Sequence, residues 1–287
     1  MKNARATGWP FIMPAMVLIG LFMIYPIISS LWMSFQTGRG TNLSFGGSSN
    51  FIRLTEDPVL IQALTNTGIF LIVQVPIMIM LSILMAVLLN DPKLKFRGLF
   101  RTAIFLPCVT SLVAYAIVFR SMFTLDGVVN QSLMSMYLIN SPIPWISDPF
   151  WAKVLVILGI TWRWTGYNMI FYLAALQNID RSIYEAARID GIPRVAVFFK
   201  ITVPMLKPVI LFTCIMSTIG TLQLFDEVVN LTRGGPGDST LTLSMYIYNL
   251  TFKFMPSFGY AATVSYVIVV LVALLSAIQF YLARERK

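Results

Sequence analysis

Histidine is absent from this sequence, and cysteine is scarce. With no His among the 287 residues, the commonest general base and the commonest metal ligand are both missing. The two cysteines, Cys108 and Cys214, lie within apolar runs without zinc-site spacing, so we expect buried small side chains, not a disulfide or a metal site. The pattern Gly-x-x-x-x-Gly-Lys-Ser/Thr, whose loop binds ATP phosphates, is also absent. We therefore predict a chain that is not an enzyme by itself and binds no cofactor or metal.

Charged residues are also few. They make up 11% of the chain, against about 25% in an ordinary soluble domain. Hydrophobic residues make up 57%, and the mean hydropathy is +0.77. This composition indicates a membrane protein within a lipid bilayer, and the sequence pI of 9.7 then indicates basic cytoplasmic loops and no nucleic-acid partner.

A membrane helix needs roughly 20 consecutive, mostly apolar residues. Six segments meet this requirement: about 11–35, 63–89, 98–123, 151–178, 205–226 and 260–283. With a cytoplasmic N-terminus, the inner segments hold fourteen of the 21 cations and five acids, while the outer segments hold six cations and seven acids. This bias predicts that both termini are cytoplasmic.

The inner segment between the fourth and fifth spans, residues 182–204, has strong local signals. Ser182 and Glu185 have the spacing of a capping box at a helix start. Gly191 is placed to end that short helix, and Pro193 suits the first turn of a second one. We therefore predict two short helices with partly apolar faces, of the kind that dock into a groove on a partner.

The same segment resembles the EAA loop of ABC importer permeases: Glu-Ala-Ala, three residues, Gly, nine residues, then Ile-x-Leu-Pro. Val203 replaces the leucine and is the one departure. The resemblance implies a type I ABC importer permease fold: an all-α membrane protein with six transmembrane helices in a single domain, residues 1–287, and a cytoplasmic coupling helix that contacts an ATPase subunit. The predicted ATPase-coupling residues are Glu185, Ala186, Ala187, Asp190, Gly191, Ile201 and Pro204.

Three further stretches narrow the resemblance: WRWTGYNMIFYLAALQ (162–177), LTRGGPGDSTLTLSMYIYNLTF (231–252) and FGYAAT (258–263). They resemble the permeases of importers for maltose, other oligosaccharides and glycerol phosphate. Such importers pair two sister permeases, and the LTxGGP sequence resembles the partner that carries this motif. The resemblance implies a heterodimer with a sister permease, ATPase subunits that hold ATP and Mg, and an extracytoplasmic solute-binding protein. It also implies location in a bacterial or archaeal cell (inner) membrane.

A sugar pathway needs aromatic faces and a few polar groups. In the family, the positions matching Trp162, Tyr167, Ser217 and Thr221 line the sugar site or lie beside it. Polarity and position add others, so the predicted substrate-pathway residues are Trp162, Trp164, Tyr167, Asn168, Ser217, Thr221 and Gln223.

Each pathway residue also has a plainer interpretation. Serine, threonine and amide side chains within spans often bond a neighbouring helix, and the tryptophans could pack against the sister subunit. Asp226 and Glu227, at the outer mouth, could be solvated rim charges. Arg163, near the bilayer middle, has to face a cavity, pair with an acid on the sister chain, or extend to the interface.

Other functions remain open at this stage. The EAA loop alone allows an ABC importer for another polar solute, such as glycerol phosphate or an amino acid. A membrane-embedded enzyme would need an intramembrane catalytic pair, and half of a secondary transporter would need a carboxylate deep in a span. We find neither in the sequence.

Overall fold

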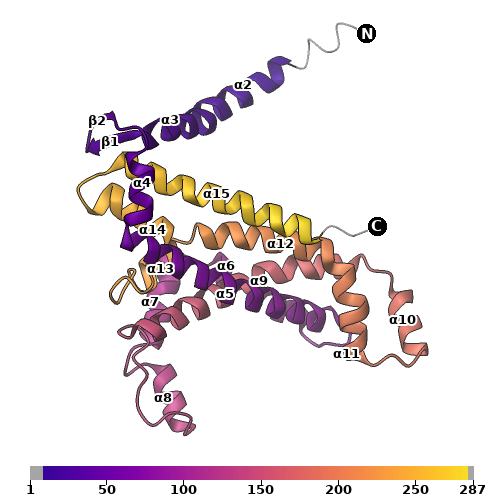
Figure 1. Cartoon of the computed structure of the whole chain (residues 1–287). Helices are drawn as coiled ribbons and strands as arrows, with labels where there is room; N and C mark the ends of the chain where they lie inside the picture. The colour runs from indigo at the N-terminus through magenta and orange to yellow at the C-terminus, as the bar shows by residue number, and fades with distance from the viewer. Residues whose placement is uncertain (1–8, 284–287) are drawn as a thin grey trace, which may run out of the picture. The chain divides into compact units, whose positions relative to one another are not determined.

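The computed structural model describes residues 9–283, which are mostly helical (Figure 1). The helices, with three π-helical turns (η1–η3), are α2 (Trp9–Ile19), η1 (Gly20–Ile24), α3 (Tyr25–Ser34), α4 (Ser49–Glu56), α5 (Pro58–Asn90), α6 (Arg97–Val109), α7 (Leu112–Met122), α8 (Val128–Ser135), α9 (Pro149–Gln177), α10 (Arg181–Ile189), α11 (Arg194–Val197), η2 (Phe198–Thr202), α12 (Val203–Leu222), α13 (Asp226–Leu231), α14 (Leu243–Tyr248), η3 (Asn249–Lys253) and α15 (Phe258–Ala283). Within the described residues, the departure from an all-helical fold is the antiparallel hairpin of β1 (Gln36–Arg39) and β2 (Asn42–Phe45).

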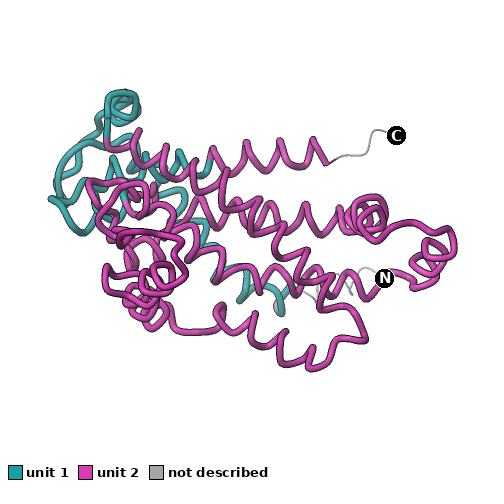
Figure 2. The backbone as a smooth tube through the Cα atoms, turned by 90° about the horizontal axis from the view of Figure 1, so that it is seen from below, with its two compact units in different colours: residues 1–58, 246–269 teal, residues 59–245, 270–287 magenta. Residues whose placement is uncertain are grey.

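The chain divides into two compact units (Figure 2): residues 1–58 with 246–269, and residues 59–245 with 270–287. In the first unit, buried polar groups hold the hairpin and α4 in place. The Asn50 amide donates to the carbonyls of Ser34 (2.9 Å) and Gln36 (2.7 Å), and Thr263 donates to the Ser34 carbonyl at 3.1 Å. The first unit therefore ties the end of α3 to both α4 and α15.

Two apolar cores lie in the described part of the second unit. One lies between α5, α9 and α12, where residues such as Ala86, Tyr172 and Leu206 are fully buried. The other joins α7, α9 and α13 through Tyr115, Leu155 and Leu231. Both cores pack against α9, which is thereby held along much of its length.

Gly166 allows α6 to pack directly against α9. A Cβ atom at Gly166 would lie 2.0 Å from the backbone oxygen of Ile104 and 2.7 Å from its carbonyl carbon. Because that neighbour is backbone and not a flexible side chain, any residue larger than glycine would separate the two helices.

The predicted third span, 98–123, is not a continuous helix. It breaks between α6 and α7, whose axes differ by 101°. Thr110 has an extended backbone conformation at the break, and Pro107 lies one turn before it. Proline removes a helical hydrogen bond and weakens the helix there, which accounts for a break close to this position.

Four helical segments in residues 9–283 are long and apolar enough to cross a membrane: Phe11–Ser34, Pro58–Asn90, Arg194–Leu222 and Phe258–Ala283. The bent pair α6–α7 makes a fifth if it counts as one span. The predicted fourth span corresponds to α9, which has 29 residues but is too polar to be counted with these. The predicted fifth span ends earlier than expected, at Leu222.

Candidate substrate cavity

A cavity of about 570 Å³ lies between α5, α9 and α12, with one residue of α7 and the segment after α12 completing its wall. Six of the seven predicted pathway residues line it: Trp164, Tyr167, Asn168, Ser217, Thr221 and Gln223. The lining residues of α9 recur every three or four positions from Ile160 to Phe171, and those of α12 recur in the same way from Phe212 to Thr221. Such spacing places them on one face of each helix.

Trp162 lies outside this lining, on another face of α9. Its ring stacks on Tyr115, with centroids 5.7 Å apart, and also contacts Phe119 at 5.8 Å. Half of the residue is exposed. In this structure Trp162 packs against α7 of its own chain and has no place in the cavity wall.

Four aromatic rings form a continuous row along the cavity. Trp164 and Tyr167 are 5.7 Å apart, Tyr167 and Phe171 are 5.1 Å apart, and Phe171 and Phe212 are 5.6 Å apart, measured between centroids. All four residues are in the lining. A ligand with flat apolar C–H faces could pack on such a row.

Amide and hydroxyl groups lie close to this aromatic row. Thr221 donates to the Gln74 side-chain oxygen at 3.3 Å, which joins α12 to α5. Asn168 donates to the Trp164 carbonyl at 3.1 Å, and the amide nitrogens of both Gln74 and Asn168 approach the sulfur of Met78. Sulfur is a weak acceptor, so these amides keep hydrogen-bonding capacity for a polar ligand.

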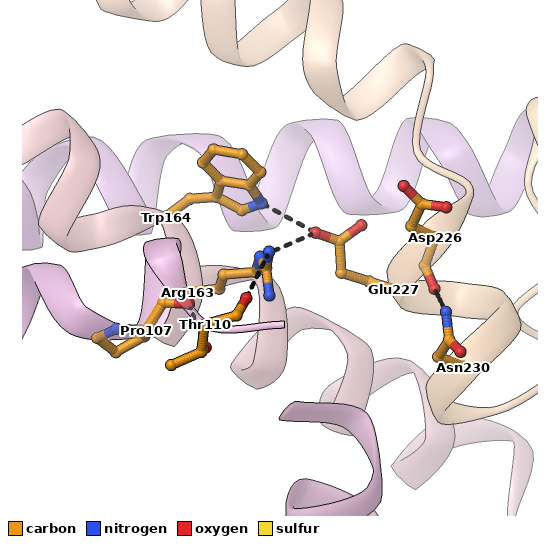
Figure 3. A network of polar contacts seen from close by, with 7 residues as sticks. All are labelled: Pro107, Thr110, Arg163, Trp164, Asp226, Glu227 and Asn230. Atoms are coloured by element: carbon orange, nitrogen blue, oxygen red, sulfur yellow. Dashed lines mark hydrogen bonds and ion pairs between the residues drawn. The ribbon is translucent and has the colours of Figure 1, made fainter. Parts of the chain in front are cut away.

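Charged residues lie at one end of the cavity, where α9 meets α13 (Figure 3). The Trp164 indole N–H donates to Oε1 of Glu227 at 3.0 Å, and Nε of Arg163 lies 3.9 Å from the same oxygen. Nη2 of Arg163 also donates to the Thr110 carbonyl at 3.5 Å, at the break between α6 and α7. The interpretation of Glu227 as a solvated rim charge is wrong, because packing against α9 leaves it only 5% exposed. Arg163 lines the cavity, which is one of the three alternatives given for it, and its acidic neighbour is on its own chain.

This combination suits an uncharged, hydroxyl-rich ligand better than a metal ion. Over residues 9–283 there is no group of His, Cys, Asp and Glu side chains that could hold a metal. The cavity instead provides aromatic faces, amides and hydroxyls, and its charged residues are the partly compensated pair Arg163 and Glu227 and the exposed Asp226. A few well-placed polar groups on a largely apolar wall are typical of small-molecule sites.

Residues 58–287 match the family described as binding-protein-dependent transport system inner membrane component. The chain belongs to this family. The family consists of membrane components of transport systems. A membrane component does not need the ATP-binding loop that this sequence lacks.

This inner membrane component has close relatives among sugar permeases. It is 68% identical to the lactose transport system permease protein LacF of Rhizobium radiobacter over 282 residues, which cover 98% of this chain and 95% of LacF. It is 36% identical to the arabinooligosaccharides transport system permease protein AraP of Halalkalibacterium halodurans, with 95% and 85% of the two chains covered. A crystal structure of a bacterial ABC transporter involved in alginate import has the same fold, with a TM-score of 0.85 at 23% identity and coverage of 98% and 96%.

The predicted coupling segment of this inner membrane component projects as α10 beyond the ends of α9 and α11 (Figure 1). The predicted capping box is wrong: the helix begins earlier, and the Asp180 carboxylate accepts from the Ser182 backbone N–H at 2.9 Å. This bond, followed by one to the Ser182 side chain, lowers the pKa of Asp180. The predicted end at Gly191 is confirmed by its positive φ of 66°.

The second short helix also differs from the prediction. Pro193 precedes α11 instead of lying in its first turn, and α11 continues through η2 into α12, so Arg194–Leu222 is one helical segment. Among the predicted coupling residues, Ala187 is buried and Ile201 partly buried, and the exposed ones are Glu185, Ala186, Asp190, Gly191 and Pro204. Ile189, which was not predicted, is 86% exposed beside them.

Two residues of α5 that were not predicted as pathway residues, Gln74 and Met78, also line the cavity. Gln74 is an amide in an otherwise apolar helix and is 1% exposed, so its polarity was an available signal. Met78 had no such signal, because methionine is common throughout the predicted spans.

Proposed function

We propose that this chain is the membrane-spanning permease subunit of an ATP-driven importer, and that it forms half of the pathway for a sugar or oligosaccharide. The observation that carries the proposal is the 68% identity, over 98% of the chain, to a lactose permease. The cavity supports it with an aromatic row beside amide and hydroxyl groups, a pairing that matches the C–H faces and hydroxyls of a sugar.

In this proposal the whole chain, 1–287, acts as one transmembrane domain with six membrane segments and both termini in the cytoplasm. The segments are α2–η1–α3, α5, the bent pair α6–α7, α9, α11–α12 and α15. α9 is included despite its polarity because its polar residues face the cavity and other helices. A sister permease supplies the other half of the pathway, and an extracytoplasmic solute-binding protein delivers the sugar.

ATP and Mg are bound by partner ATPase subunits, which we propose contact α10, the turn after it and α11. The exposed apolar side chains of Ile189 and Val195, 86% and 70% exposed, suit burial in a groove of the ATPase. ATP binding drives transport only if the closed ATPase pair favours one orientation of the permease. α9 and α11–α12 both connect to the α10 segment, so they are placed to transmit that preference to the cavity.

The coupling proposal is tested with Ile189→Asp, compared with the matched control Ile189→Leu. The buried interface would have to accept an unpaired carboxylate, so we expect about tenfold less ATPase subunit to co-purify with the aspartate variant and a corresponding loss of uptake. The leucine variant keeps an apolar side chain and is expected to assemble normally. Normal co-purification and sugar uptake with Ile189→Asp would show that this segment is not the ATPase contact.

The substrate class is tested with the complete importer in proteoliposomes containing ATP. We expect ATP-dependent uptake of a β-galactoside or an arabino-oligosaccharide that requires the binding protein. Uptake of glycerol phosphate or an amino acid, with no sugar uptake, would establish the alternative type of importer.

A further inference from the structure

Arg163 of α9 and Glu227 of α13 form a buried ion pair that lacks close contacts and most of the possible hydrogen bonds. The Arg163 and Glu227 side chains are only 9% and 7% exposed, yet their closest atoms are 3.9 Å apart. Nε and Nη1 of Arg163 are buried without a hydrogen bond, and Nη2 makes only its 3.5 Å contact with Thr110. An arginine has five N–H donors, so most of its capacity is unused in this conformation.

An ion pair with so few close contacts can change partners at a low cost in free energy. A buried ion pair offsets its loss of hydration only when geometry is good and the remaining donors are satisfied. Here the carboxylate has one short bond, from Trp164, and the cation has none. The contact therefore stabilises this conformation only moderately, so closure of the ATPases could open it and leave the arginine free to change partner.

The connectivity places this contact where transport would strain it. α9 leads into α10, and α10 leads through α11 into α12; α13 begins four residues after α12 ends. The contact thus joins the middle of α9 to the segment just beyond the far end of α12. A movement of α12 against α9 that carries α13 with it changes the separation of Arg163 and Glu227, and the cavity lies between α9 and α12.

We propose that Arg163, Trp164 and Glu227 form a latch, which holds α9 to α13 in the resting importer and opens when the ATPases close on ATP. The proposal rests on the proposed function. Figure 3 shows the three side chains converging, with the Thr110 carbonyl of the α6–α7 break beside them. Trp164 and Glu227 supply the hydrogen bond, and Arg163 is the member that changes partner. The latch stabilises the resting conformation and so suppresses ATP hydrolysis in the absence of loaded binding protein.

The test is basal ATP hydrolysis by the purified complete importer without binding protein. We expect Glu227→Gln and Arg163→Gln each to raise it about fivefold, because each removes the charge attraction. The double variant is expected to rise no further, because the two residues act as one unit. Asp126→Asn, which removes an exposed carboxylate from the segment after α7, is the matched control and is expected to leave hydrolysis unchanged.

Two outcomes would overturn the latch. One is unchanged basal hydrolysis in both single variants with a raised sugar concentration for half-maximal uptake, which would make the residues sugar contacts only. The other is independent, multiplying effects in the double variant. If a charge variant fails to assemble, Trp164→Phe, which removes the indole N–H together with part of the aromatic ring, is expected to raise basal hydrolysis about twofold; no rise would also overturn the proposal. Sugar uptake by the wild-type importer in the same preparation tests the proposed function separately. If the wild type does not take up sugar, the proposed function fails, whatever the variants do to ATP hydrolysis.

Discussion

Asp57 and Glu227 are both buried carboxylates, but their surroundings differ. Asp57, in the first unit, accepts hydrogen bonds from the Tyr246 and Tyr260 hydroxyls at 2.5 Å and 2.6 Å, and the Arg53 guanidinium lies 3.8 Å from the centre of the Tyr260 ring. Glu227, in the second unit, has one bond at 3.0 Å and an arginine atom at 3.9 Å. Short, multiple hydrogen bonds to a charged group stabilise one conformation. The comparison indicates a fixed structural joint at Asp57 and a movable one at Glu227.

The largest expected effect comes from Asp57→Leu. The substitution leaves two buried tyrosine hydroxyls without their acceptor, so we expect the free energy of unfolding to fall by about 3–5 kcal/mol. The measurement is denaturation of the purified complex in detergent. Glu56→Leu, at the exposed neighbouring residue, is the control and is expected to have little effect. A small loss of stability with Asp57→Leu would show that the Asp57 joint is not fixed by these bonds.

Amide variants of the two carboxylates separate the loss of charge from the loss of shape. Asp57→Asn brings amide donors toward two hydroxyls that now donate, so we expect a loss of about 1–3 kcal/mol. Glu227→Gln keeps an acceptor for the Trp164 indole. At 3.9 Å its carboxylate gives the buried Arg163 cation little compensation to lose, so we expect a change below about 1 kcal/mol. Both are measured by the same denaturation curve. Equal losses would mean that the two carboxylates play the same structural role.

Among the changes at Asp57, the smallest loss is expected from Tyr246→Phe, which removes one of the two bonds to Asp57 and costs about 1 kcal/mol at neutral pH. Burial, followed by the hydrogen bond to Asp57, raises the pKa of the Tyr246 hydroxyl. The unfolded chain loses this proton at a pH of about 10, so the contribution is fully present below that pH and is lost as the pH rises above it.

We therefore expect wild-type stability to fall between about pH 9 and 11 by more than that of Tyr246→Phe. Thermal unfolding over this range provides the measurement. Tyr137→Phe, at a residue that is 92% exposed, is the control and is expected to follow the wild type. Parallel curves for wild type and Tyr246→Phe would show that this hydroxyl does not contribute to the alkaline loss.

Helical spacing explains why much of the cavity could be predicted from the sequence. Trp164, Tyr167 and Asn168 lie three or four residues apart, so a helix brings them to one face whatever packs around it. Ser217 and Thr221 follow the same rule on α12. Trp162 was predicted as a pathway residue from the family resemblance, but it lies on the face of α9 that packs against α7.

What could not be predicted depends on contacts between distant segments. Burial of Glu227 results from α9 packing on α13, and no local pattern near residue 227 encodes it. Likewise, the choice of Asp180 over Ser182 as the capping residue depends on where the preceding helix ends. The break in the predicted third span had a local sign in Pro107, but proline alone does not distinguish a tolerated kink from a 101° turn.

The backbone contact at Gly166 also limits how the protein can be re-engineered. Since no side chain fits between α9 and α6 there, the two helices have to shift as one rigid body, and flexibility is left to the sharp corner that follows α6. Enlarging the passage for bulkier sugars is therefore more promising through trimming side chains on α12 than through prising α6 away from its neighbour.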